Sequence, residues 1–206
     1  MHIGIIGTGP MARSLARGWL QAGHTIQIGS RQPQAKSALL KEAPGAALAA
    51  IADTVVTAEV VVAAIPYVAV APFARQYADQ LKEKLLIDIA NPFEHLADNR
   101  RAGAEITAQA IGPGARVVAA FKANFWETLL QPVSSQASST RDVFYAGDDA
   151  ADKVIVAQLI ADLGFQPIDC GPLRNARILD GMVPLLLELD ERYAAGAHRL
   201  SWKLLG

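Results

Sequence analysis

The chain has 206 residues, a formal net charge of −1 and one cysteine, Cys170. The balanced charge gives no reason to expect binding to nucleic acid or to an anionic membrane, and a lone cysteine excludes an internal disulfide. No apolar run approaches the length that a bilayer requires, and the N-terminus lacks the basic region of a signal peptide. We therefore expect a globular, cytoplasmic protein without a membrane span.

Residues 1–31 read as strand, glycine turn, helix and strand. Residues 2–6 are an almost continuous apolar run, which is typical of a strand buried on both faces of a parallel sheet. Residues 11–21 carry apolar side chains at helical spacing, and Gly23 follows as the terminating residue. Residues 25–31 predict a second strand.

The turn between the first strand and the helix has the spacing G-x-G-x-x-A. Gly7 permits the tight turn, Gly9 leaves room for a pyrophosphate beside the backbone, and Ala12 lets helix and strand pack closely. The free N–H groups at the start of the helix favour a bound phosphate. We therefore predict a dinucleotide site that includes Gly7, Thr8, Gly9, Pro10 and Met11.

The end of the second strand indicates which dinucleotide binds. NAD-binding folds usually place a carboxylate there, about 20 residues after the glycines, to bond the ribose 2′-hydroxyl. This chain has Ser30 and Arg31 instead, a hydroxyl and a guanidinium that suit a 2′-phosphate. We expect NADP(H), with Lys36 as a second candidate for the phosphate. The alternative is that Ser30 only caps the next helix and that Arg31 and Lys36 are solvated charges.

The remaining elements alternate between strands and helices. Further strands are expected over residues 46–50, 60–65, 85–89, 116–120, 143–146 and 165–169. Helices are expected over residues 33–42, 52–58, 69–81, 105–111 and about 147–163, with a long apolar helical region after residue 173. This alternation predicts an α/β fold, namely a doubly wound, mainly parallel Rossmann sheet with a small C-terminal α/β extension.

A loop-like stretch over residues 132–140 predicts a domain boundary. Residues 1–131 would form the NADP-binding domain, and residues 141–206 a smaller domain that completes the cleft. Residues 94–100 are polar and are expected to be irregular. The C-terminal helical region is apolar on more than one face, so it must be buried against the first domain, a second subunit or both. We expect a homodimer.

Ligands of a doubly wound sheet bind beyond the carboxyl ends of its strands. The residues expected at the nicotinamide side are Ala64, Ile65, Pro66 and Tyr67. Tyr67 is the best suited of these to stack on a ring. Asn91 and the segment 121–126 follow two other strands, and we include Asn91 and Lys122 in the predicted site. Lys122 could contact an acidic tail or a ring carbonyl of a second ligand, or equally point to solvent.

Motifs along nearly the whole chain resemble one known family. They are the Gly7-Thr8-Gly9 turn, Gly29-Ser30-Arg31, the run from Val60 to Pro66 and, most specifically, Ala146–Asp149, Leu163–Phe165 and Asp169–Arg177. Together they resemble the NADPH-dependent deazaflavin reductases, also called coenzyme F-420-dependent NADP oxidoreductases. The same module forms the oxidoreductase domain of the six-transmembrane metalloreductases.

The resemblance implies that Thr8, Ser30 and Arg31 hold the 2′-phosphate. It also implies that a flavin-type ring, from coenzyme F-420 or from FMN or FAD, stacks on the nicotinamide in a cleft between the two regions. Hydride transfer between stacked rings requires no side-chain nucleophile. We accordingly predict no catalytic side chain, and the four histidines lack the spacing of metal ligands.

Two positions depart from the family pattern. Lys122 stands where the family commonly has asparagine or histidine, and Cys170 stands where alanine is usual. Cys170 could have a redox role, but a small buried apolar residue is the simpler interpretation. Two other functions stay open. One is a reductase of a small carbonyl or imine substrate, and the other is a non-catalytic NADPH-binding sensor or partner-binding protein.

Overall fold

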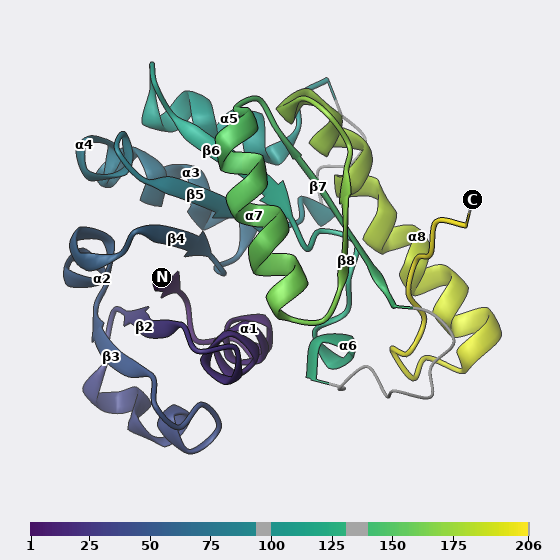
Figure 1. Ribbon diagram of the computed structural model, residues 1–206, viewed down its shortest axis with the longest axis horizontal. Coiled ribbons are helices and arrows are strands. Elements are labelled where there is room, and N and C mark those ends of the chain that lie inside the picture. Colours follow the sequence, from purple (N-terminus) through teal and green to yellow (C-terminus); the bar gives the residue numbers. More distant parts are fainter. Residues whose placement is uncertain (94–99, 131–139, 206) are drawn as a thin grey trace.

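The computed structural model describes residues 1–93, 100–130 and 140–205. Eight strands form one sheet in the order β3-β2-β1-β4-β5-β6-β7-β8 (Figure 1). The strands are β1 (His2–Ile6), β2 (Thr25–Ser30), β3 (Ala47–Ala50), β4 (Val60–Ala63), β5 (Leu85–Asp88), β6 (Arg116–Ala120), β7 (Asp142–Gly147) and β8 (Gln166–Asp169). The first six are parallel, whereas β7 runs antiparallel to β6 and parallel to β8.

This order is that of a Rossmann sheet, so the predicted α/β fold is confirmed. The helices are α1 (Pro10–Gln21), α2 (Ile51–Thr57), α3 (Tyr67–Gln76), α4 (Ala78–Leu81), α5 (Gly103–Ile111), α6 (Trp126–Leu130), α7 (Ala150–Asp162) and α8 (Ala176–Ala194). Two short 3₁₀ helices, η1 (Gln34–Lys41) and η3 (Leu173–Asn175), complete the described elements that the site needs.

The strands alternate their side chains between two apolar layers, as the pleat requires. One layer packs Ile3, Val62 and Ile87 against α1 and α7, and the indole Nε1 of Trp19 in α1 donates to the carbonyl of Leu159 in α7 at 2.9 Å. The opposite layer joins the sheet to helices α2, α3, α4, α5 and α8. Helix α8 lies at the right of Figure 1, beside the C-terminal strands.

Two predicted helices differ from the structure. The segment expected to form a helix over residues 33–42 is the 3₁₀ helix η1 instead. The helix expected over residues 69–81 is divided at Tyr77, whose φ of −111° is not helical, into α3 and α4. Pro72 within α3 lacks an N–H group, which weakens the hydrogen bonding of that helix shortly before the break.

The C-terminal region continues the same sheet, because β7 pairs with β6. The boundary expected at residues 132–140 falls almost wholly on residues 131–139, which lie outside the described residues, as do residues 94–99 of the segment expected to be irregular. Helix α8 is apolar on more than one face: Leu179 and Val183 are buried, while Ile178 and Leu185 are exposed. In the described part of the chain, no helix combines the length and apolarity needed to cross a membrane.

Candidate functional site

The glycine turn between β1 and α1 brings two strand ends together. Gly7 has a φ of +123°, a conformation that favours glycine, and a Cβ at this position would overlap the carbonyl oxygen of Ala64. The N–H group of Gly7 donates to the carbonyl of Gly29 at the end of β2, at 3.1 Å. Only glycine therefore lets this turn lie between the ends of β2 and β4.

The first turn of α1 suits an anion. Pro10 occupies the first turn of the helix, no side chain caps the helix start, and none of its first residues is acidic. The backbone N–H groups and the helix dipole are thus available to a phosphate. A Cβ on Gly9 would meet no other atom within 4 Å, so this residue borders open space.

A cavity of about 610 Å³ lies over this turn, and we call it the turn cavity. It is lined by Gly7, Thr8, Gly9, Gly29, Ser30, Arg31, Gln32, Lys36, Ile51, Ala64, Ile65 and Pro66. The lining holds two cations and no carboxylate. In the described part of the chain, neither Arg31 nor Lys36 is paired with an acidic side chain. The site therefore fits a dinucleotide that carries an additional phosphate.

The side chain of Ser30 has a local role in this structure. Its hydroxyl oxygen accepts a hydrogen bond from the N–H group of Gln32 at 3.1 Å, which stabilises the turn after β2. The residue is nearly buried, although it lines the turn cavity. The hydroxyl can still donate its own proton to a phosphate.

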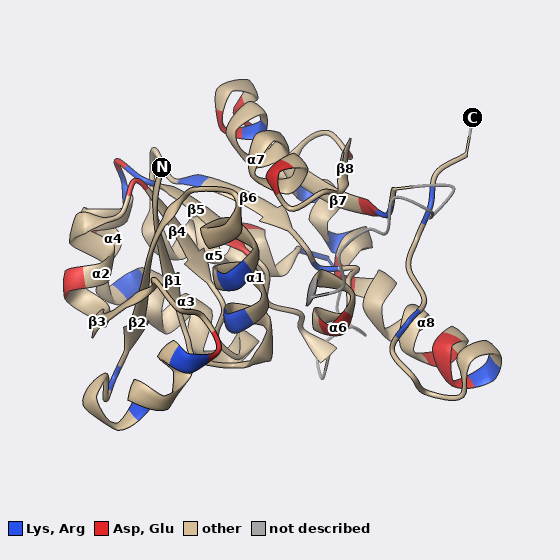
Figure 2. Cartoon of the chain, turned by 60° about the horizontal axis from the view of Figure 1, so that its bottom comes forward, with Lys and Arg blue, Asp and Glu red and all other residues tan. Residues whose placement is uncertain are grey.

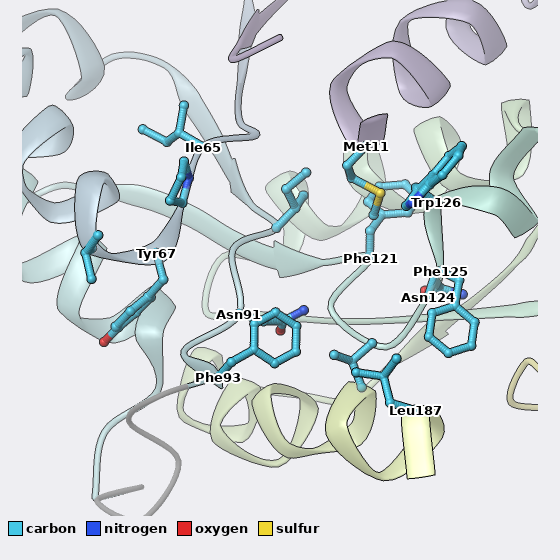
Figure 3. A pocket seen from close by; sticks show the side chains of 14 residues that line it. Met11, Ile65, Tyr67, Asn91, Phe93, Phe121, Asn124, Phe125, Trp126 and Leu187 are labelled. Atoms are coloured by element: carbon cyan, nitrogen blue, oxygen red, sulfur yellow. The ribbon is translucent and has the colours of Figure 1, made fainter. Parts of the chain in front are cut away.

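A second cavity, of about 550 Å³, is lined mainly by aromatic and aliphatic side chains, and we call it the aromatic cavity (Figure 3). Its lining residues are Met11, Ile65, Pro66, Tyr67, Val68, Ile89, Asn91, Phe93, Phe121, Asn124, Phe125, Trp126, Val183 and Leu187. They come from the start of α1, from the carboxyl ends of β4, β5 and β6, and from α6 and α8. The two cavities share Ile65 and Pro66, so they meet at the carboxyl end of β4.

Twelve of the fourteen predicted site residues line one or both of these cavities, and the other two do not. In the turn cavity are Gly7, Thr8, Gly9, Ser30, Arg31, Lys36 and Ala64, in the aromatic cavity are Met11, Tyr67 and Asn91, and in both are Ile65 and Pro66. Pro10 lines a third cavity, between α1 and the segment 41–44. Lys122 lines none of these three cavities.

Lys122 is fully buried, so neither of the two sequence expectations for it describes the structure. Its ammonium lies 2.9 Å from Oδ1 of Asp180 and 3.4 Å from Oδ1 of Asp88, and it also donates to the carbonyl of Ala90. It thus neither points to solvent nor faces the aromatic cavity. We call Asp88, Lys122 and Asp180 the buried ion cluster.

The carboxylates of the buried ion cluster have further donors. Asp88 accepts from the Thr107 hydroxyl at 2.7 Å, and Asp180 accepts from the Gly103 N–H group, at the N-terminus of α5, at 2.9 Å. Burial alone would lower the pKa of Lys122, but Asp88 and Asp180 outweigh it and hold that pKa above its usual value. The lysine is therefore a permanent cation in the interior.

Two amide side chains border the aromatic cavity with part of their hydrogen-bonding capacity unused. Asn91 donates to the carbonyl of Lys122 at 3.0 Å, and Asn124 donates to the carbonyl of Asp142 at 3.1 Å. Among the described residues, the side-chain oxygen of each has no hydrogen-bond partner. These oxygens are acceptors suited to N–H groups of a ligand.

Tyr67 forms a wall of the aromatic cavity, and its ring also packs closely on α5. A Cβ on Gly103 would lie 2.9 Å from a ring carbon of Tyr67, so the small residue permits this packing. Burial, and then the negative charges of Asp180 and Asp88, raise the pKa of the Tyr67 hydroxyl. The phenol therefore stays protonated at neutral pH.

Nine residues of the aromatic cavity are absent from the site predicted from the sequence. They are Val68, Ile89, Phe93, Phe121, Asn124, Phe125 and Trp126, to which α8 adds Val183 and Leu187. The rule that ligands lie beyond strand ends could have identified the segment 121–126 as a whole, since it directly follows β6. Nothing local in the sequence places α8 against that segment.

Cys170 lies outside both cavities and is partly buried against the second apolar layer. Burial raises the pKa of its thiol, which keeps the sulfur protonated and weakly nucleophilic. This favours the interpretation of Cys170 as a small apolar residue.

The strand order is that of a Rossmann sheet, and its glycine turn lies beside a basic cavity that has no carboxylate in its lining. An aromatic cavity adjoins it. These features define a dinucleotide-binding protein of the oxidoreductase type. The sequence pattern of one family, NADP oxidoreductase coenzyme F420-dependent, matches residues 2–92. The F420-dependent NADP reductase of Methanothermobacter thermautotrophicus is 31% identical over 93% of this chain and 90% of its own length. The chain therefore belongs to the family of F420-dependent NADP oxidoreductases.

Two further relatives extend this comparison. A crystal structure from Arthrobacter sp. FB24, assigned as an F420-dependent NADP reductase, superposes with a TM-score of 0.86 at 32% identity and covers 99% of both chains. The metalloreductase STEAP3 of Rattus norvegicus is 32% identical over 90% of this chain. This chain spans only 36% of the length of STEAP3.

Proposed function

We propose that this protein transfers hydride between NADP(H) and a planar ring of the flavin type, either a deazaflavin such as coenzyme F-420 or a flavin such as FMN or FAD. The observation that carries the proposal is the junction of the two cavities at Ile65 and Pro66. A cofactor that extends from the turn cavity to this junction would present its reactive end to the aromatic cavity.

The residues of the turn cavity suit both phosphate-bearing parts of NADP(H), the pyrophosphate and the 2′-phosphate. The N–H groups at the start of α1 would bind the pyrophosphate, and Arg31, with Lys36 beside it, would bind the 2′-phosphate. A carboxylate would repel that phosphate, and the lining contains none. When bound, NADPH supplies the hydride.

The aromatic cavity suits a flat second ligand. Five aromatic side chains, from Tyr67, Phe93, Phe121, Phe125 and Trp126, offer faces and edges to a ring, and the volume of about 550 Å³ lies within the range of small-molecule sites. The side-chain oxygens of Asn91 and Asn124 would accept from the N–H groups of a nicotinamide carboxamide or of a flavin pyrimidine ring. The chain's own part in the reaction is to orient the two rings and to exclude water.

An acceptor screen tests the proposal. The purified protein is mixed with NADPH or NADH and, in turn, with coenzyme F-420, FMN, FAD and riboflavin, and the absorbance of the reduced nicotinamide is followed. We expect oxidation with at least one of these rings and a preference for NADPH. NADPH oxidation only with small imines or carbonyl compounds would contradict the acceptor class. Tight NADPH binding with no oxidation by any acceptor would favour the non-catalytic sensor.

A further inference from the structure

The third cavity, of about 620 Å³, lies between α1, the end of η1 and Trp126 of α6, and we call it the α1 groove. Its lining residues are Pro10, Arg13, Ser14, Arg17, Leu20, Gln21, Lys41, Glu42, Pro44 and Trp126. Three cations face one carboxylate here, so the groove has a formal charge of +2. Nothing in the reaction between two rings requires a second basic cavity.

The α1 groove adjoins the aromatic cavity. Trp126 lines both cavities, and its side chain is 39% exposed. Three consecutive residues at the start of α1 each line a different cavity. Gly9 lines the turn cavity, Pro10 lines the α1 groove and Met11 lines the aromatic cavity. In Figure 3, Met11 and Trp126 lie close together at one side of the aromatic cavity. A ligand in the aromatic cavity could thus extend past Trp126 into the groove.

The charges of the α1 groove are locally unfavourable. Arg13 and Arg17 lie one turn apart on the same face of α1, where like charges repel, and Arg13 stands near the positive end of the helix dipole. Figure 2 shows α1 with blue, basic segments along it. Glu42 compensates Arg13 with an ion pair of 2.7 Å. In the described part of the chain, Arg17 and Lys41 have no carboxylate partner. Local rules are most often broken where a ligand completes the site.

We propose that the α1 groove binds an anionic side chain of the hydride acceptor whose ring lies in the aromatic cavity. The physiological acceptor then carries a phosphate or carboxylate group on the arm attached to its ring, and Arg17 and Lys41 bind that group. This inference rests on the proposed function. We expect the phosphates of NADP(H) to occupy the turn cavity, whose lining includes Arg31 and Lys36, and so not to compete for the groove.

Paired acceptors that share a ring but differ in the arm test the inference. FMN and riboflavin have the same ring, and only FMN carries a phosphate. Coenzyme F-420 and its tail-free deazaflavin chromophore form a second pair. KM is measured for each acceptor with the parent protein, with Arg17→Ala and Lys41→Ala, and with Arg75→Ala as a control, because Arg75 is an exposed arginine of α3 outside all three cavities.

We expect each groove variant to raise the ratio of the KM for the anionic acceptor to that for its neutral counterpart about three- to tenfold, the size of one screened charge-assisted contact. The Arg75→Ala variant keeps the parent ratio. Higher salt raises the KM of the anionic acceptor more in the parent than in Arg17→Ala. An unchanged ratio in both groove variants, while the rings are still reduced, would refute the groove assignment and leave the proposed function intact.

Dissociation constants for FMN and riboflavin, from quenching of flavin fluorescence, keep the inference testable if turnover is slow. A parent protein that binds FMN no better than riboflavin refutes the groove assignment. A failure of all four acceptors to bind or to accept hydride refutes the proposed function itself, so the two failures are distinguishable.

Discussion

The ammonium of Lys122, just beyond β6, lies 2.9 Å from the carboxylate of Asp180 in α8. Asp180, Val183 and Leu187 share one face of α8, and the latter two line the aromatic cavity. The ion pair therefore anchors the helix that forms one wall of that cavity. The carbonyl of Lys122 also accepts from Asn91 on another wall. The ammonium and the backbone carbonyl of Lys122 thus join α8, the end of β5 and Asn91 beside the site.

Replacing this cation should strongly destabilise the fold. Lys122→Met leaves the buried carboxylates of Asp88 and Asp180 without their cation, and we expect a loss of about 3–5 kcal/mol in the free energy of unfolding. Urea denaturation followed by circular dichroism measures it. Lys82→Met, which removes an exposed pair with Asp79, should change stability by less than about 1 kcal/mol.

A triple variant separates charge from packing at the buried ion cluster. Adding Asp88→Asn and Asp180→Asn to Lys122→Met removes the uncompensated charges while keeping acceptors for Thr107 and Gly103. Much of the lost stability should return. A triple variant that is no more stable than Lys122→Met alone would show that the uncompensated charges are not the cause of the loss.

Replacing Arg31 should alter the preference between the two dinucleotides. Arg31→Ser removes a charge-assisted contact to the 2′-phosphate, so binding of NADPH should weaken by about 1.5–3 kcal/mol more than binding of NADH. Dissociation constants for both cofactors, from protein fluorescence, measure the difference. The control is Arg75→Ser, which removes an equal charge from the last turn of α3, at a residue that does not line the turn cavity. An equal loss for NADPH and NADH in Arg31→Ser would rule out the 2′-phosphate role.

The parts of the site that could be predicted from sequence are local. The glycine turn and Arg31 are recognised within about 30 residues of chain, because the turn geometry itself restricts which residues occur there. Lys122 was misjudged for the opposite reason. A lysine is normally exposed, and its two carboxylate partners lie in distant segments that meet it only in the folded sheet.

The errors in secondary structure have a similar origin. The apolar spacing of residues 33–42 does not distinguish an α-helix from the 3₁₀ helix η1, in which Leu39 is the buried residue. The aromatic cavity was missed in part because Val183 and Leu187 belong to a helix whose partner cannot be read from its own sequence. Local patterns thus predicted the lining of the turn cavity better than that of the aromatic cavity.

The stability of the fold should depend on pH through His198, which follows α8 in the C-terminal segment. The imidazole Nδ1 of His198 lies 2.8 Å from Oε1 of Glu127 in α6, and the ring stacks on Phe125. The backbone N–H group of His198 donates to the carboxylate of Asp190 in α8. The hydrogen bond to Glu127 raises the pKa of His198 in the folded protein. The stabilisation is therefore complete below the unfolded pKa of about 6.5 and is lost as pH rises through the higher folded pKa.

His198→Asn tests this sign, since asparagine tolerates the φ of +52° at this position. The parent should exceed the variant in stability most at pH 5–6, a window set by the histidine pKa of about 6.5, and the gap should narrow toward pH 9. Urea midpoints at several pH values measure the gap. A gap that is constant over this range, or that widens with pH, would contradict the role of the charged imidazole.

Two glycines should respond to alanine in opposite directions. In Gly7→Ala the new methyl group would overlap the carbonyl of Ala64 at a φ of +123°, so we expect a loss of about 1–3 kcal/mol in stability and weaker dinucleotide binding. In Gly181→Ala the methyl group meets no atom within 4 Å on an exposed turn of α8, so stability should rise by about 0.5–1 kcal/mol. Urea denaturation and NADPH titration of both variants measure these effects. Normal NADPH affinity in a Gly7→Ala variant that is destabilised as expected would contradict the placement of the pyrophosphate at this turn.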